Sequence, residues 1–328
     1  MFLYCDFPSW IRPEVIPGFP VRWYAVMYIV AFTICYVLFR YQCRKENVLK
    51  KMSADMSQTA FTYVIFGLLL GARLGSVLIY EGNSYYWTHP WMILWPFRNG
   101  VFVGLPGMSY HGGVVGALLG AVIFCRTYKY DFWEFTDTVI AGIPIGYTFG
   151  RLGNFINGEL WGRCTGSSYG MIFPEAPLFS TASAWVREAA DKAGISYVPG
   201  DWISLPRHPS QLYEAFFEGI VTFLIVWFVV RPYVRKPENR KCSGIISGSY
   251  FFLYAFFRFF IEYFREPDSQ LGFIIALGKE TEPTALFKSV LNFSMGQILC
   301  ALMMAGGIIV IVFALKRGSR DRTVKHGK

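Results

Sequence analysis

The sequence predicts an all-α, polytopic membrane protein with seven transmembrane helices, and three observations lead to this class. Hydrophobic residues make up 54% of the 328 residues and aromatic residues 19%, whereas only 16% are charged. Seven mostly apolar runs are each about twenty residues long, which is the length that an α-helix needs to cross ~30 Å of hydrocarbon. Lysine and arginine gather after alternate runs, as expected for a polytopic protein that follows the positive-inside rule.

The apolar runs define one membrane-embedded domain over residues 1–328. A longer polar segment, residues 160–207, is rich in proline, glycine, serine and mixed charge, and it predicts a small extracytoplasmic head between spans four and five. Within it we expect a short helix near residues 183–193. The first twenty residues lack the basic, apolar and small-residue regions of a cleaved signal peptide. The seven runs extend roughly over residues 20–39, 60–80, 103–125, 137–157, 210–230, 245–264 and 295–315.

Basic clusters predict the orientation of the seven spans. They follow spans one, three, five and seven, at Arg40, Arg44, Lys45, Lys50 and Lys51, at Arg126 and Lys129, at Arg231, Arg235, Lys236, Arg240 and Lys241, and from Lys316 to Lys328. These clusters share one side, which the positive-inside rule makes cytoplasmic, so we expect the N-terminus outside and the C-terminus inside. Because the net charge of +9 is placed in this way, we expect no nucleic-acid partner. The seven cysteines form no Cys-x-x-Cys pair, so we expect neither a disulfide framework nor a metal site.

Small residues and tryptophans at helical spacing predict packing and surface features. Glycines recur every fourth residue in three spans, which lets helix backbones approach closely, so we expect these spans to form the packed centre. They are Gly67, Gly71 and Gly75, then Gly112, Gly116 and Gly120, and then Gly142, Gly146 and Gly150. Trp87, Trp91 and Trp95 share the same spacing between spans two and three, and they predict a short interfacial helix, or arm.

A polar stretch at the outer end of span four is the first candidate site. Between Gly150 and Gly162 the chain carries Arg151, Asn154, Asn157 and Glu159 in an otherwise apolar, glycine-rich context. Ionisable groups at membrane depth are costly unless they face a polar cavity, so they predict a functional site. A polar clamp between helices that binds no ligand is the alternative.

A second polar set lies on span six, where Tyr254, Arg258, Glu262 and Arg265 follow one helix face. The two polar sets together contain three arginines, Arg151, Arg258 and Arg265, but only two glutamates, Glu159 and Glu262. We therefore expect a surplus of positive charge at this site. Arginine binds phosphate through a planar fork of donors, so the site suits a phospholipid headgroup.

Four further residues are candidates for this site. Histidine is the usual general base for a hydroxyl or thiol, whereas a hydrogen-bonded structural histidine is the alternative at both positions considered. Arg73 lies in Gly71 to Gly75, which faintly resembles Gly150 to Gly153. Tyr24, near the start of span one, has the position of a headgroup-level anchor. The two histidine candidates are His111 before span three and His208 before span five.

The stretch from Gly150 to Gly162 resembles, position by position, the signature of the bacterial prolipoprotein diacylglyceryl transferases. Four other pieces resemble further motifs of this family in the same order, and the similarity extends over nearly the whole chain. They are Met108 to Gly113, His208 to Glu214, Arg258 to Asp268, and Ser294 to Gln297.

The resemblance implies an enzyme of the bacterial inner membrane that needs no cofactor. Such an enzyme moves the diacylglyceryl group of phosphatidylglycerol to the sulfhydryl of the lipobox cysteine in a prolipoprotein signal peptide. It forms a thioether and releases glycerol phosphate, which is the first step of lipoprotein maturation. The resemblance implies that Arg151 and Arg258 hold the phosphate and that His111 is the base. It also implies that the headgroup site is shaped by Asn154, Glu159 and Tyr254, and that Tyr24 lines the cavity.

Two other classes fit parts of the sequence. A secondary transporter for an anionic solute would also use glycine-packed helices and buried arginines, but it needs a polar path through the membrane, and the polar groups here crowd one end. A non-catalytic lipid-binding protein would need the arginines and would leave His111 without a role. Both alternatives predict that no thiol is modified.

Overall fold

The computed structural model describes residues 4–16, 18, 21–46, 48–81, 85–95, 97–98, 100–102, 107–239, 242–267, 272–278, 285–287 and 289–326. Asp268, Arg240, Lys241 and Lys328, which belong to the motifs and basic clusters above, lie outside these residues. The described residues form mostly helices, with a few two-stranded sheets. They divide into two compact units, one of residues 1–37 and 139–328 and one of residues 38–138. The divisions fall inside α1 (Trp23–Lys45) and α5 (Phe132–Ile140).

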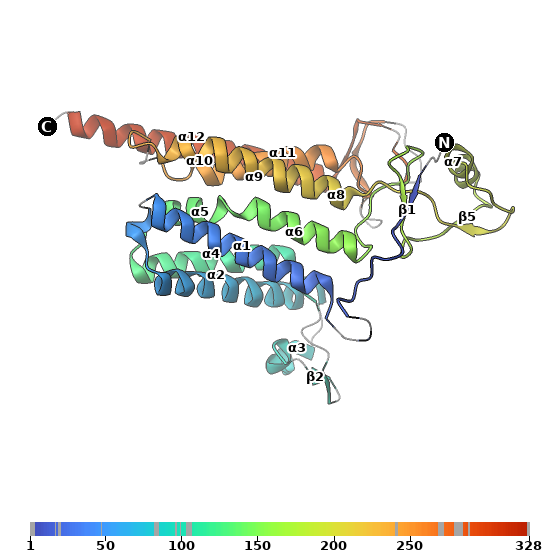
Figure 1. Ribbon diagram of the computed structural model, residues 1–328, viewed down its shortest axis with the longest axis horizontal. Coiled ribbons are helices and arrows are strands. Elements are labelled where there is room, and N and C mark those ends of the chain that lie inside the picture. The colour runs from blue at the N-terminus through green and yellow to red at the C-terminus, as the bar shows by residue number, and fades with distance from the viewer. Residues whose placement is uncertain are drawn as a thin grey trace. The chain divides into compact units, whose positions relative to one another are not determined.

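The unit of residues 38–138 is built on a close pair of helices, α2 and α4, which lie side by side in Figure 1. Ser53 caps α2 by accepting a hydrogen bond from the Met56 amide at 3.2 Å, and Ser109 caps α4 by accepting one from the Gly112 amide at 3.1 Å. The elements of this unit after α1 are η1 (Leu49–Lys51), α2 (Ala54–Gly75), η2 (Ser76–Glu81), α3 (Tyr85–Thr88), η3 (Pro90–Ile93), β2 (Phe97–Arg98), β3 (Val101–Phe102) and α4 (Tyr110–Tyr128).

Glycines form the contact between α2 and α4, as the spacing predicts. A Cβ atom added to Gly116 would lie 2.8 Å from the Gly71 Cα atom and would collide with the Gly67 carbonyl oxygen. A Cβ atom at Gly120 would likewise collide with the carbonyl oxygen of Tyr63. The two backbones therefore touch directly, which confirms the prediction for the glycines of these two helices. Gly150 differs, because nothing lies within 4 Å of the place where its Cβ atom would be.

The tryptophan-rich segment between α2 and α4 contains two short helical turns, α3 and η3, followed by the β2–β3 hairpin. The single interfacial helix that the tryptophan spacing predicts is therefore broken at His89, where Pro90 starts the second turn. Trp91 and Trp95 are exposed, the Trp87 side chain lies outside the described part, and the position of this arm at the membrane interface stays a prediction.

The other unit contains the longest helices. Its elements after α5 are α6 (Ile143–Ile156), β4 (Met171–Ile172), β5 (Phe179–Ser180), α7 (Ala184–Ala193), β6 (Trp202–Ile203), α8 (Ser210–Glu214), η4 (Ala215–Val221), α9 (Thr222–Ile225), η5 (Val226–Val230), α10 (Arg231–Arg235), α11 (Ile245–Ile261), β7 (Phe273–Ala276), β8 (Asn292–Ser294) and α12 (Met295–His326), and β1 (Cys5–Asp6) precedes α1. The elements from α8 to α10 follow one another without a break, and η4 and η5 are π-helical.

Close helix contacts in this unit also occur at glycine. Gly219 in η4 lies against Thr148 of α6, whose hydroxyl and Cα atom would be struck by a Cβ atom at that position. Gly248 of α11 meets Gly307 of α12, where a Cβ atom would be 2.8 Å from the facing carbonyl oxygen. The first contact brings α6 and η4 together, and the second brings α11 and α12 together.

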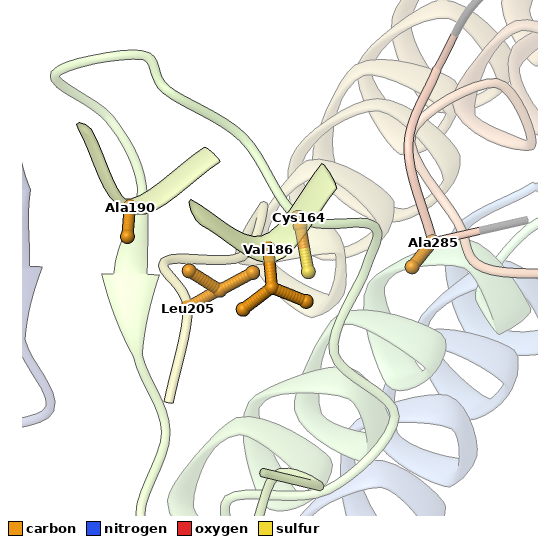
Figure 2. Close-up of a cluster of buried hydrophobic side chains, with 5 residues drawn as sticks. All are labelled: Cys164, Val186, Ala190, Leu205 and Ala285. Atoms are coloured by element: carbon orange, nitrogen blue, oxygen red, sulfur yellow. The ribbon is translucent and has the colours of Figure 1, made fainter. Parts of the chain in front are cut away.

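The head has its own small hydrophobic core, formed by Cys164, Val186, Ala190, Leu205 and Ala285 (Figure 2). The predicted helix near residues 183–193 is confirmed as α7, and Figure 2 shows its Val186 pointing toward Leu205 and Cys164. Two more segments join residues 160–207, because β1 pairs with β4 and Ala285 completes the core. The head, with α7 and β5, lies at one end of the helices of this unit, and the C-terminal end of α12 lies at the other (Figure 1).

In the part of the chain that the structure describes, five helices are long and apolar enough to cross a membrane: Trp23–Lys45, Ala54–Leu78, Tyr110–Tyr128, Ser210–Arg235 and Met295–Gly318. The run expected to be span four is divided at Ala141 and Gly142 between α5 and α6, where Pro144 occupies the first turn of α6. The run expected to be span six is α11, a shorter apolar helix. The chain is thus mostly helical with several membrane-length helices, and the count of seven stays a prediction.

Widening the α2–α4 contact should destabilise the fold. Gly116→Val places a branched side chain against the Gly71 backbone, and overpacking of this kind costs about 1–3 kcal/mol. Gly306→Val in α12 is the matched control, because nothing lies within 4 Å of its Cβ position. We expect a lower thermal-unfolding midpoint in detergent for Gly116→Val than for Gly306→Val. Equal midpoints would show that α2 and α4 are not in backbone contact.

Candidate functional site

Charged side chains from three helical segments gather in the unit that contains α6, α8 and α11. Arg151 comes from α6, Glu214 and Glu218 come from the start of the long helix that α8 begins, and Arg258 comes from the last turn of α11. The side chains of Glu214 and Glu218 have no solvent-exposed surface. Because a buried carboxylate is costly unless it is paired, this arrangement requires cations close by.

Glu214 lies at the centre of the cluster. Its Oε2 atom is 2.7 Å from Arg151 Nε and 3.1 Å from Arg258 Nη1, and its Oε1 atom accepts a hydrogen bond from Arg265 Nη1 at 2.7 Å. One carboxylate therefore joins three guanidinium groups. Arg151 and Arg258, which are far apart in the sequence, approach the same oxygen atom.

Two more carboxylates balance the arginines. Arg258 Nη2 lies 3.2 Å from Glu262 Oε2, and Arg258 Nη1 lies 3.8 Å from Glu218 Oε1. Among the described residues the cluster thus holds three arginines and three glutamates. The predicted surplus of positive charge is wrong, because that count left out Glu214 and Glu218.

The motif from Ser294 to Gln297 holds Glu262 in place. The Ser294 hydroxyl donates a hydrogen bond to Glu262 Oε1 at 3.1 Å, and a Cβ atom at Gly296 would lie 2.6 Å from the same oxygen. The glycine therefore lets the start of α12 approach the carboxylate. The predicted helix face is interrupted, because α11 ends at Ile261 and Arg265 lies beyond it, but Arg265 Nε still lies 3.7 Å from Glu262 Oε2.

A second polar group extends from Arg151 past the end of α6. Arg151 Nη1 is 3.4 Å from Asn154 Oδ1, and Asn154 Nδ2 donates to Glu159 Oε1 at 2.9 Å. The chain turns between them at Gly158, which has a φ of +68° and ends α6 in the left-handed conformation typical of helix C-termini. Gln211 Nε2 donates to the Glu159 carbonyl at 2.6 Å and fixes this turn against α8.

Aromatic residues surround the arginines. The ring of Tyr147 lies under Arg151, with its centroid 4.9 Å from the guanidinium carbon, and Tyr254 meets Tyr147 edge to face at 5.5 Å. Tyr24 packs on α6 at Gly153, where a Cβ atom would be 3.3 Å from its ring. The site residues predicted from α6, α11 and the start of α1 are therefore brought together in one unit.

His208 lies at the base of the head, apart from the arginine contacts described above. Its Nδ1 atom is 3.3 Å from the Tyr213 hydroxyl, and its ring meets that of Phe264 at 5.1 Å. Burial, with a smaller effect of Arg163, lowers the pKa of His208 to about 4, so its imidazole is neutral at physiological pH. These contacts indicate a packed structural histidine.

His111 and Arg73 belong to the unit of residues 38–138, so the cluster is described without them. His111 is the second residue of α4 and is exposed. Arg73 is buried, and it donates from Nε to the Ile93 carbonyl at 2.6 Å and from Nη1 to the Gly107 carbonyl at 3.3 Å. Arg73 thus ties the segment around η3 and the approach to α4 to the end of α2.

Two members of the cluster, Tyr147 and Glu218, were not predicted from the sequence, and Glu214 was predicted only as part of a motif. A signal for each was present. Glu214 and Glu218 are acidic residues four apart in an apolar helix, and Tyr147 is four residues before Arg151, which places each pair on one helix face.

One family and several known proteins are similar to this chain over most of its length. The family model described as "Prolipoprotein diacylglyceryl transferase" matches residues 14–313. A protein of Treponema pallidum (strain Nichols) named "Phosphatidylglycerol--prolipoprotein diacylglyceryl transferase" is 46% identical over 315 residues, covering 92% of each chain. Proteins of the same name from Treponema denticola and Borreliella afzelii are 45% and 43% identical, and each match covers at least 95% of both chains. The chain therefore belongs to the prolipoprotein diacylglyceryl transferase family.

Proposed function

We propose that this chain transfers the diacylglyceryl group of phosphatidylglycerol to the lipobox cysteine of prolipoproteins, the first step of lipoprotein maturation. The observation that carries the proposal is family membership over almost the whole chain, with relatives of 43–46% identity that bear the name of this activity. The buried arginine cluster supports it with a chemical basis, because the reaction has a phosphate leaving group.

The reaction requires stabilisation of the negative charge on the departing phosphate. A carbon–sulfur bond forms to the glycerol carbon while the carbon–oxygen bond to phosphate breaks, and the bonding electron pair stays with the phosphate oxygen. Negative charge therefore grows on the phosphate, and guanidinium donors placed beforehand lower the barrier. Arg151 and Arg258 suit this role, because both point at one oxygen atom of Glu214 and so converge on one small region.

Free donors remain on both arginines although the cluster is balanced in charge. Among the described residues, Arg151 donates from Nε to Tyr147 and from Nη1 to Asn154, and its contacts leave Nη2 unused. The ion pairs of Arg258 run through Nη1 and Nη2 and leave Nε unused, and Nη1 makes no directed hydrogen bond there. Each guanidinium also keeps 17–18% of its side-chain surface exposed. A phosphate can therefore bind at the open edges while Glu214 holds the inner edges.

Other residues of the cluster take supporting roles in the proposal. Asn154 and Glu159 offer acceptors for the hydroxyl groups of the glycerol headgroup, and Tyr254, Tyr24, Glu262 and Arg265 shape the site around the arginines. We assign His111 as the base that takes the thiol proton, because it is an exposed histidine at the first turn of α4.

We place the chain in the bacterial inner membrane as seven spans, with α6 and α11 completing the five membrane-length helices. The N-terminus and the head then lie outside and the C-terminus inside, where the basic clusters follow spans one, three, five and seven. The position of the head and of the α12 end at opposite ends of their unit supports this orientation (Figure 1).

Loss of either arginine fork should abolish transfer. Arg258→Lys keeps the charge but loses the planar fork, and Arg151→Ala removes a partner of the buried Glu214, a change that costs about 3–5 kcal/mol. We expect both purified variants to transfer labelled diacylglycerol from phosphatidylglycerol to a lipobox peptide at rates reduced by about 100-fold or more.

Arg235→Ala at the end of α10 is the control and should retain the rate of the unmodified protein, and thermal unfolding of every variant separates catalysis from folding. Normal rates for both arginine variants would exclude the phosphate clamp. If the unmodified protein binds the lipid but modifies no thiol, a lipid-binding protein is the better description, and phosphate flux into vesicles would indicate a transporter.

Cysteine chemistry should belong to the substrate alone. Cys164 is the cysteine nearest in sequence to Glu159, but burial raises the pKa of its thiol to about 11, so the reactive thiolate is scarce at neutral pH. We therefore expect Cys164→Ser and Cys164→Ala to keep transfer activity. Loss of transfer in both variants, with the fold intact, would point to a covalent intermediate on the enzyme.

The orientation can be tested with reporter fusions. Alkaline phosphatase inserted in the head between Ala182 and Ser183, just before α7, should be active, because both residues are exposed and we place the head outside. The same reporter fused after Gly318 should be inactive, whereas a fluorescent protein there should be bright. The opposite pattern would invert the proposed topology.

A further inference from the structure

The hydroxyl group of Tyr147 lies between charged side chains of the cluster, and the proposed transfer reaction gives it no role. Arg151 Nε lies 2.7 Å from this oxygen, Glu218 Oε2 lies 2.5 Å from it, and Glu214 Oε2 lies 3.4 Å from it. One phenol therefore connects the arginine of α6 with two carboxylates of the neighbouring helix.

The chemistry of the groups fixes the direction of these hydrogen bonds. An arginine Nε can only donate, so the phenol oxygen accepts from Arg151. A phenol carries one proton, so it can donate to one carboxylate only, and the shorter distance selects Glu218. A separation of 2.5 Å is within the range of charge-assisted O–H to carboxylate hydrogen bonds, whereas 3.4 Å is too long for one.

This arrangement divides the two carboxylates between different partners. Since the phenol donates its hydrogen bond to Glu218, Glu214 Oε2 is left to pair with the charges of Arg151 and Arg258, at 2.7 Å from Arg151 Nε and 3.1 Å from Arg258 Nη1. The Nε–H group of Arg151 donates to the Tyr147 oxygen, and the guanidinium also lies beside Glu214 and on the Tyr147 ring. These contacts restrict rotation of the guanidinium and so limit the positions of its outer nitrogen Nη2.

Packing holds Tyr147 and Glu218 firmly. Glu218 has no exposed surface and precedes Gly219, the residue at which η4 touches Thr148 of α6. The Thr148 hydroxyl lies 3.3 Å from the Ala215 carbonyl and ties the same two helices together. The π-helical turn of η4 lies at this contact, and π-turns are frequent at functional sites.

We propose that Tyr147 and Glu218 are positioning residues that orient Arg151 toward the phosphate of phosphatidylglycerol. The inference rests on the proposed function, in which Arg151 binds that phosphate. The Tyr147 oxygen accepts a hydrogen bond from Arg151 Nε. Glu218 accepts the hydrogen bond that the phenol donates, so the phenol O–H points away from Arg151. The specificity of the site for a phosphate at one defined place depends on this chain of contacts.

The test is a double-mutant cycle on transfer from phosphatidylglycerol vesicles to a lipobox peptide. Tyr147→Phe removes the oxygen that accepts from Arg151 and donates to Glu218 and should lower kcat/KM by about tenfold or more, because the lost contact to Arg151 is a hydrogen bond to a charged group. In an Arg151→Lys background, which lacks the Nε donor, Tyr147→Phe should change the residual rate by less than about twofold. Tyr263→Phe is the matched control, because its hydroxyl donates to the Val290 carbonyl outside the cluster, and it should retain the rate of the unmodified protein.

Glu218 gives an independent arm. Glu218→Gln retains a carbonyl that can accept from the phenol and should lose less activity than Glu218→Ala, whereas a role in packing alone would not depend on an acceptor. Equal loss in both variants, or full additivity of Tyr147→Phe with Arg151→Lys, would overturn the inference. Absence of transfer by the unmodified protein would instead overturn the proposed function, so the two failures are distinguishable.

Discussion

The carboxylate of Glu214 is the interaction on which the rest of the cluster depends. Three guanidinium groups converge on its two oxygen atoms, and it has no contact with solvent. Three buried cations in an apolar bundle would repel one another and would each carry a large desolvation cost. A shared anion turns that repulsion into a fixed geometry, so the positions of Arg151, Arg258 and Arg265 all follow from one side chain. Glu218 and Glu262 then complete the balance at the edges of the cluster.

Helix contacts at small residues make this geometry possible. Gly219 has no side chain where η4 meets Thr148, and Gly296 leaves room beside Glu262. The helix backbones therefore come near enough for the arginine and glutamate side chains to pair. Larger residues at these places would hold the helices apart and would leave the carboxylates unpaired. The glycines of the α2–α4 contact act in the same way within their own unit, because a side chain at Gly116 would collide with Gly67. The ion pairs in this bundle therefore depend on close helix packing, and glycines mark the places in the sequence where that packing occurs.

The sequence predicted the helical class, the α2–α4 contact, the head helix and the members of the cluster that stand out as charges in apolar runs, such as Arg151 and Arg258. It failed where a property depends on three-dimensional neighbours. The spacing of Glu214 and Glu218 in an apolar run places them on one helix face but does not show that they lie against Tyr147 and the arginines. The predicted surplus of positive charge disappears once these two glutamates are counted. The break between α5 and α6 was also missed, because a proline in the first turn of a helix leaves the hydrophobic run unbroken. Periodicity reports which face of a helix is apolar, and it does not report which helix lies opposite.

Arginine explains how a neutral cluster can still bind an anion. A guanidinium group has five donors on a planar frame, so one edge can hold a carboxylate while another edge meets a phosphate. Arg151 follows this pattern, since Nε faces Glu214 and Tyr147 whereas Nη2 meets no described residue. A lysine in its place could serve the carboxylate or the ligand but could not fix the direction between them. The resident glutamates therefore do not compete for the whole arginine. They hold its inner edge, and the orientation that results leaves the outer edge for the phosphate in the proposed reaction.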